Sequence, residues 1–198
     1  MSKKRQRSKL NRKQLTFLVI ICLILIIIIP VAFTNIKSEN TDQTTTEQKV
    51  PKQYHAALTV AKNYSNVMHM SKRAIKEQLT ADTAKFSSET IQYTLKHLKA
   101  NYNQNALKKA EEYSTSQNMS KQAIYDQLIS KSKFTAQQAQ YAVDNLKADY
   151  NQNALITAKA YQRDLHFSPA TIREVLISNK NEKFTPEQAD YAIQHLND

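Results

Sequence analysis

The 198-residue sequence contains no glycine and one cysteine. Without glycine, the Gly-rich loops that cradle phosphates are excluded, and β-hairpins with glycine turns are disfavoured. The single cysteine, Cys22, excludes an intramolecular disulfide and a metal site built from several cysteines. These absences remove nucleotide-binding loops and disulfide scaffolds from the classes of protein to consider.

Acidic residues are missing from the N-terminal tail, so the net charge of +11 is unevenly distributed along the chain. Residues 1–14 carry seven basic residues and no acidic one, whereas residues 15–33 carry no charge at all. The three later segments 56–105, 106–153 and 154–198 have net charges of +4, +1 and −1. Most of the basicity therefore belongs to the tail, and the overall charge does not by itself indicate nucleic-acid binding.

The uncharged segment 15–33 predicts a transmembrane helix, because nineteen residues at about 1.5 Å each span roughly one hydrocarbon core. A cleaved signal peptide is disfavoured by Phe33, where a small residue is expected. A lipoprotein signal is disfavoured by Ile21, since Gly, Ala or Ser should precede Cys22. The segment is also too apolar for a buried core helix. We expect an uncleaved anchor.

The flanks of this segment predict its orientation. The basic tail, residues 1–14, should remain in the cytoplasm, so that residues 34–198 lie outside a single-pass anchor in the cell membrane. Residues 34–55 are polar and rich in threonine and glutamine, and such a segment buries too little apolar surface to order itself. We expect it to be a flexible tether.

Three copies of one pattern follow the tether. The copies are spaced by 49 residues from Leu58 to Leu107 and by 48 residues from Leu107 to Leu155. Each carries an Ala-Leu-x-x-Ala-x-x-Tyr motif, a Met-Ser or Phe-Ser pair, an Ile-x-x-x-Leu pair, and a phenylalanine before a final Tyr…Leu run. A period of this length is typical of tandem supersecondary units. The copies are assigned to residues 56–105, 106–153 and 154–198.

Each copy predicts three helices. Helical spacing of the apolar residues gives the first, and serine or threonine N-caps begin the second and third. The expected N-caps are Ser71, Ser120 and Ser168 for the second helix, and Ser87, Thr135 and Thr185 for the third. Gln138 and Gln188 have the spacing of a capping box. Phe86, Phe134 and Phe184 are expected to fill the small cores rather than to bind a ligand.

The connections between copies, residues 99–105 and 147–153, contain neither proline nor glycine. Tyr102 and Tyr150 also keep helical spacing with their neighbours. We therefore expect the third helix of one copy to run, with or without a kink, into the first helix of the next. The predicted fold is all-α: an N-terminal transmembrane helix, then three tandem three-helix, helix-turn-helix-like repeats in an elongated array.

The repeated motif resembles the Ltp-type repeat of host cell surface-exposed lipoproteins from Gram-positive bacteria and their temperate phages. The resemblance covers about 140 of the 198 residues and is fullest at 106–146 and 184–196. The first copy departs from it at Thr90-Ile91, where the other copies have Gln-Ala. The resemblance implies superinfection exclusion, in which a prophage-encoded surface protein blocks DNA injection by a second phage through its tape-measure protein.

No residue is assigned a catalytic, metal-binding or cofactor-binding role, and the sequence points to neither an enzyme nor a small-molecule substrate. The histidines align with asparagine in other copies (His69 and His166 with Asn118; His97 and His195 with Asn145), which indicates polar turns or surface sites. DNA binding is disfavoured because Lys72, Arg73 and Lys76 of the first copy correspond to Pro169, Ala170 and Arg173 in the third, so the basic residues are not kept in every copy.

The remaining expectation is a protein partner, for example an amphipathic helix received in a groove between repeats. The residues that bind it are not identifiable from the sequence. Core positions recur, but a single sequence does not separate binding positions that differ between copies from positions that have merely drifted. An envelope protein that binds cell wall or an endogenous protein, without a phage role, is the alternative.

Overall fold

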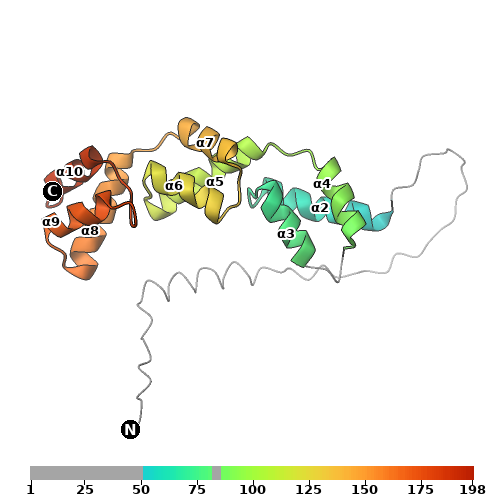
Figure 1. Ribbon diagram of the computed structural model, residues 1–198, viewed down its shortest axis with the longest axis horizontal. Helices are drawn as coiled ribbons and strands as arrows, with labels where there is room; N and C mark the ends of the chain where they lie inside the picture. The colour runs from blue at the N-terminus through green and yellow to red at the C-terminus, as the bar shows by residue number, and fades with distance from the viewer. Residues whose placement is uncertain (1–50, 82–85) are drawn as a thin grey trace, which may run out of the picture. The chain divides into compact units, whose positions relative to one another are not determined.

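The computed structural model describes residues 51–81 and 86–198, and every regular element in these residues is an α-helix (Figure 1). The helices are α2 (Lys52–Asn66), α3 (Lys72–Ala81), α4 (Ser88–His97), α5 (Tyr102–Gln117), α6 (Lys121–Ser130), α7 (Ala136–Asn145), α8 (Tyr150–Leu165), α9 (Pro169–Ile177) and α10 (Pro186–Gln194). They form three repeats, α2–α4, α5–α7 and α8–α10. The all-α class and the three three-helix repeats are confirmed. The elongated arrangement stays a prediction.

The basic tail, the expected anchor at 15–33 and most of the expected tether lie outside the described residues. Among the residues that are described, no helix is both long and apolar enough to cross a membrane. α2 begins at Lys52, so the last four residues of the segment 34–55 are helical.

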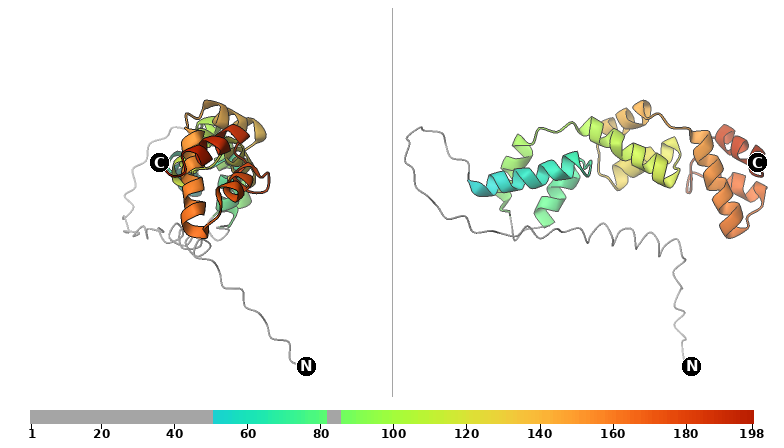
Figure 2. Two further views of the ribbon diagram at one scale, coloured as in Figure 1. Left: turned by 90° about the vertical axis from the view of Figure 1, so that its left-hand side faces the viewer. Right: turned by 180° about the vertical axis from the view of Figure 1, so that it is seen from behind.

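Each repeat packs its three helices around a small core of its own, and the right-hand view of Figure 2 shows the three helices of a repeat grouped together. The isoleucine and leucine of the second helix are at most 1% exposed in all three repeats: Ile75 and Leu79, Ile124 and Leu128, Ile172 and Leu176. Burying each such side chain stabilises the fold by about 1.5–3 kcal/mol. The two motif alanines of each first helix are fully buried and leave room for the third helix: Ala57 and Ala61, Ala106 and Ala110, Ala154 and Ala158. The recurring positions are therefore core positions, as the periodicity predicts.

The predicted caps begin the helices. The Ser120 Oγ accepts a hydrogen bond from the backbone N–H of Ala123 at 3.1 Å, and Ser71, Ser87 and Ser168 do the same in their helices. Thr135 with Gln138 and Thr185 with Gln188 form complete capping boxes. These caps satisfy backbone donors that a helix leaves unpaired at its start, each for about 1 kcal/mol.

One residue in each turn after the first helix has a left-handed backbone: His69, Asn118 and His166, with φ of 52°, 52° and 54°. The loop before the third helix repeats this geometry at Lys133 and Lys183. The left-handed region is unfavourable for residues with a Cβ, and asparagine and histidine are among those that enter it most readily. The alignment of histidine with asparagine therefore reflects the backbone of the turn.

The third helix of one repeat does not run into the first helix of the next, and that prediction was wrong. α4 ends at His97 and α5 begins at Tyr102, while the intervening Leu98 is extended at ψ 107°. The Asn101 side chain caps α5 by accepting from the N–H of Gln104, and Asp149 caps α8 in the same way. Asparagine and aspartate begin new helices as effectively as serine does, so neither proline nor glycine is needed for the break.

Candidate functional site

The first repeat carries an open groove of about 580 Å³ between α3 and α4. Its lining includes three lysines, Lys72, Lys76 and Lys96, and three apolar side chains, Phe86, Ile91 and Leu95. Lys72 and Lys76 come from α3 and stand one helical turn apart on one rim. Lys96 comes from α4, so positive charge lies on both sides of the groove.

The floor of the groove is apolar and only partly covered. Ile91 is 6% exposed, while Phe86 and Leu95 are half-buried. The corresponding phenylalanines of the other repeats, Phe134 and Phe184, are 3% exposed. All three phenylalanines pack against their cores as predicted, but Phe86 also presents part of its ring to the groove.

The second repeat joins its second and third helices by an ion pair at the equivalent position. The Lys121 Nζ donates to the Asp144 Oδ1 at 3.1 Å, and thereby links α6 to α7. Counted from the repeat motifs, Lys121 corresponds to Lys72 and Asp144 to Lys96. The opposite charges of the second repeat are thus replaced by like charges in the first. Residues of the third repeat, Lys183 among them, also line this part of the second repeat.

The third repeat links the same two helices with a different pair. The guanidinium of Arg173 on α9 donates two hydrogen bonds to the carboxylate of Asp190 on α10, at 2.5 and 3.3 Å. The hydrogen bond from Arg173 lowers the pKa of Asp190. In the first repeat the two positions are Lys76 and Gln92, which form no such pair. Each later repeat therefore has a charged bridge that the first one lacks.

The three groove lysines have no carboxylate partner among residues 51–81 and 86–198. The neighbouring Arg73 is different, because its Nε donates to Glu77 at 3.3 Å. An apolar floor between unpaired ammonium groups can bind an anionic and apolar ligand together.

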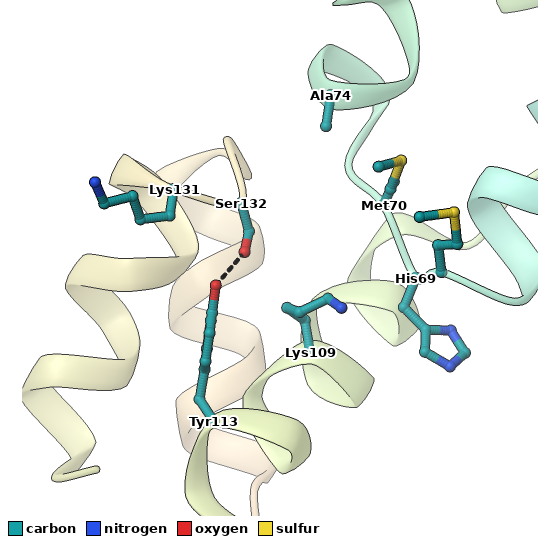
Figure 3. Close-up of a pocket in the computed structure, with 8 residues that line it drawn as sticks. His69, Met70, Ala74, Lys109, Tyr113, Lys131 and Ser132 are labelled. Atoms are coloured by element: carbon teal, nitrogen blue, oxygen red, sulfur yellow. Dashed lines mark hydrogen bonds between the residues drawn. The ribbon is translucent and has the colours of Figure 1, made fainter. Parts of the chain in front are cut away.

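A second, smaller pocket of about 370 Å³ lies where the first repeat meets the second (Figure 3). The first repeat contributes His69, Met70 and Ala74, and the second contributes Lys109 and the bonded pair of Tyr113 and Ser132. The Tyr113 and Ser132 hydroxyls are 2.7 Å apart, and burial raises the pKa of Tyr113. Of its two lysines, Lys109 is already paired with Glu112 at 2.5 Å, so that only Lys131 is without an ion pair among the described residues. This pocket therefore offers less free charge than the groove.

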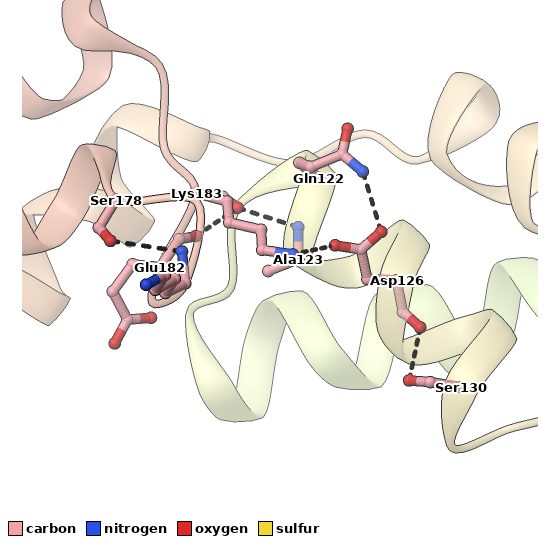
Figure 4. Close-up of polar contacts among 9 residues, drawn as sticks. Gln122, Ala123, Asp126, Ser130, Ser178, Glu182 and Lys183 are labelled. Atoms are coloured by element: carbon pink, nitrogen blue, oxygen red, sulfur yellow. Dashed lines mark hydrogen bonds and ion pairs between the residues drawn. The ribbon is translucent and has the colours of Figure 1, made fainter.

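The joints between repeats are polar and are built alike. Lys133 of the second repeat pairs with Glu77 of the first, and Lys183 of the third pairs with Asp126 of the second (Figure 4). The hydrogen bond from Lys133 lowers the pKa of Glu77. The Ser120 Oγ donates to the carbonyl oxygen of Glu182 at 2.6 Å. These side chains hold neighbouring repeats together and are occupied by that role.

A buried asparagine completes each joint. The Asn105 Nδ2 donates to the Ser65 Oγ at 2.9 Å and to the Met70 carbonyl at 3.0 Å. The Asn153 Nδ2 donates to Ser114 and to the Met119 carbonyl, both at 3.0 Å. Both asparagines are 7% exposed. The joint therefore repeats in atomic detail, which makes it structural rather than a ligand site.

The histidines lie at separate positions. His97 and His195 stack on Tyr93 and Tyr191 and bond to backbone carbonyls of their own helices, while His55 is exposed on α2. Within the described part of the chain, no three side chains of histidine, cysteine, aspartate or glutamate gather into a metal site.

The groove was not predicted from the sequence. From the sequence, Lys72 and Lys76 are considered only as possible DNA contacts, and no role is predicted for Lys96. The sequence does contain a signal for the groove. When the copies are aligned, the oppositely charged Lys121 and Asp144 of the second copy correspond to two lysines, Lys72 and Lys96, in the first.

Comparison with known proteins gives the following similarities. Residues 52–98, 101–146 and 149–196 each match the family model described as host cell surface-exposed lipoprotein. A solved structure that is similar to part of the chain is that of Ltp, a superinfection exclusion protein from the Streptococcus thermophilus temperate phage TP-J34. It is 42% identical, and the match covers 50% of this chain and 100% of that chain with a TM-score of 0.47. No curated protein matches the sequence. The three matched stretches coincide with the three helical repeats.

Proposed function

Since the chain belongs to the family of host cell surface-exposed lipoproteins, we propose that it is a membrane-anchored surface protein that excludes superinfecting phages. Three tandem matches to the family model carry this proposal, because together they contain all of the described helices. The family description supports a location at the cell surface or membrane.

The anchor in this proposal is the apolar segment 15–33, with the basic tail 1–14 in the cytoplasm and the repeats outside. Anionic lipid headgroups would hold the tail at the inner surface by about 1 kcal/mol for each basic residue near it. In this arrangement the repeats stand where an injecting phage must pass its DNA and proteins.

The repeats act by binding a protein, not by catalysis. The partner is a phage protein that enters during injection, and the family resemblance points to the tape-measure protein. The open groove of the first repeat supports a binding role, because it combines apolar surface with unpaired charge and leaves both accessible.

Expression of the full chain in a phage-sensitive host tests the function. We expect adsorption to the cells to be unchanged while entry of phage DNA falls, because the block acts after attachment. Adsorption is measured by free phage remaining in the medium, and DNA entry by quantifying intracellular phage DNA. A chain ending at residue 55 keeps the anchor without the repeats and is the matched control. Unchanged DNA entry across a broad phage panel would reject the proposal.

The alternative is an envelope protein that binds cell wall or an endogenous partner. Crosslinking in cells under phage challenge separates the two. Recovery of a phage protein supports exclusion, and recovery of host envelope proteins alone supports the alternative. An integrase and a repressor gene beside this one would favour a prophage origin.

A further inference from the structure

We propose that the α3–α4 groove of the first repeat is the docking site for an acidic amphipathic helix of the protein partner. This inference rests on the proposed function only in that the partner is a protein. It goes further by naming one repeat, one pair of helices and the chemistry of the segment that they bind.

The charge of the groove selects an acidic ligand. Lys72, Lys76 and Lys96 are exposed, carry no ionic partner among the described residues and lie on both rims. Carboxylates on both edges of a bound helix would meet an ammonium group on either side. Complementary charges of this kind speed encounter and fix orientation, and their effect is weakened by salt.

The floor of the groove selects an apolar face between those carboxylates. Phe86, Ile91 and Leu95 provide it, and α3 and α4 are each ten residues long, about 15 Å. A helix laid in such a groove inserts apolar residues at positions i, i+3 or i+4 and i+7. The groove therefore has room for about two to three turns of helix.

Comparison of the repeats indicates that the groove is open for a reason other than the fold. The second and third repeats fold in the same way with a charged bridge between the same two helices, through Lys121 and Asp144 or Arg173 and Asp190. The first repeat lacks both bridges and keeps the lysines. Neither its core nor its joint uses them, so they are free to bind a ligand.

A membrane surface fits the groove less well than a protein helix does. Interfacial binding needs apolar side chains that project into the lipid. Here Ile91 is buried, and Phe86 and Leu95 are half-buried between the two helices. Nucleic acid is disfavoured because the pair Lys72 and Lys76 is not repeated: the second repeat has Lys121 and Tyr125 at these positions, and the third has Pro169 and Arg173.

The test measures binding of a fluorescent synthetic helix of about 14 residues, with leucines on one face and glutamates on both edges, by anisotropy. The protein is the full chain in nanodiscs of zwitterionic lipid, and empty nanodiscs give the peptide's own affinity for lipid. We expect saturable, salt-sensitive binding. A matched peptide with lysines in place of the glutamates should bind at least about tenfold more weakly.

Two substitutions use the bridges of the other repeats. Lys96→Asp should pair with Lys72 as Asp144 pairs with Lys121, and Gln92→Asp should pair with Lys76 as Asp190 pairs with Arg173. Each should weaken binding of the acidic peptide by about tenfold or more, with the helical circular dichroism and the unfolding temperature retained. Asp144→Lys, which removes the bridge of the second repeat, is the control and should not weaken binding.

Several results would overturn the inference. One is equal binding of the acidic and basic peptides, and another is unchanged binding of the acidic peptide by a folded Lys96→Asp variant. The third is a protein that does not bind the acidic peptide but binds phosphatidylglycerol vesicles, with the vesicle binding abolished by Lys96→Asp. Phage exclusion tested in parallel keeps the two proposals separate. Exclusion that survives Lys96→Asp rejects the groove alone, and peptide binding by a chain that excludes no phage rejects the function alone.

Discussion

At the scale of single residues, the core of the first repeat differs from those of the other two repeats because it contains buried threonines. Thr90 and Thr94 are buried where the second repeat has Gln138 and Ala142. The Thr90 hydroxyl lies 3.0 Å from the Ser87 hydroxyl, but the Thr94 Oγ1 is buried without a hydrogen-bond partner. A buried hydroxyl without a partner loses its hydration and regains nothing.

Thr94→Ala should therefore stabilise the protein by about 1 kcal/mol, because it removes the unpaired hydroxyl and favours the helix. Denaturant unfolding of the full chain, followed by circular dichroism, measures the change. The reciprocal substitution Ala142→Thr places the same hydroxyl in the second repeat and should lower the stability. A loss of stability in Thr94→Ala would mean that the hydroxyl has a partner in solution.

At the scale of elements, the connections between repeats are short breaks held by side chains. Asn101 and Asp149 begin α5 and α8, and within the next turn Asn105 and Asn153 reach back to the preceding repeat. The first half of each connection ends a helix. The second half starts the next helix, whose first turn is hydrogen-bonded to the preceding repeat through the buried asparagine. The position of one repeat on the next thus depends on a few buried hydrogen bonds.

Asn153→Ala should destabilise the second joint by about 1–3 kcal/mol, because it leaves the Ser114 hydroxyl and the Met119 carbonyl buried without a donor. Denaturant unfolding gives the energy, and limited proteolysis should show faster cleavage at residues 147–149. Gln152→Ala, at the exposed neighbouring position, is the control and should change neither. Equal cleavage of both variants would show that this asparagine does not hold the joint.

At the scale of the whole molecule, charge and hydropathy divide the chain into parts with different surroundings. The tail is strongly basic, the following segment is apolar, and the repeats pass from a net charge of +4 to −1. This distribution carries the proposed orientation, with the basic end in the cytoplasm and the repeats outside.

Protease added to intact, wall-stripped cells should remove the repeats and leave a short fragment that contains the tail. Tags at the two ends, detected by immunoblot, report which part survives, and a cytoplasmic protein must stay uncut. Permeabilised cells serve as the positive control. Full protection of the repeats would reverse the orientation and revive the DNA-binding alternative.

The sequence alone determined the features that depend on neighbours along the chain. Helix caps are bonds between residues three apart, and core positions follow the helical period, so Ser120, Thr135 and the Ile124–Leu128 pair are identifiable from the sequence. Repetition strengthens these predictions, because each position occurs three times. The predicted continuous helix through Tyr102 was wrong because the Asn101 side chain caps a new helix there.

Only the tertiary structure decided which residues distant in sequence act together. Lys183 meets Asp126 across 57 positions, and Lys121 meets Asp144 across 23. The groove is recognised by the absence of such a pair between Lys72 and Lys96, and an absence acquires meaning only when the two helices are known to face each other. Local chemistry specifies helices and turns, whereas a binding surface is a property of how their faces meet.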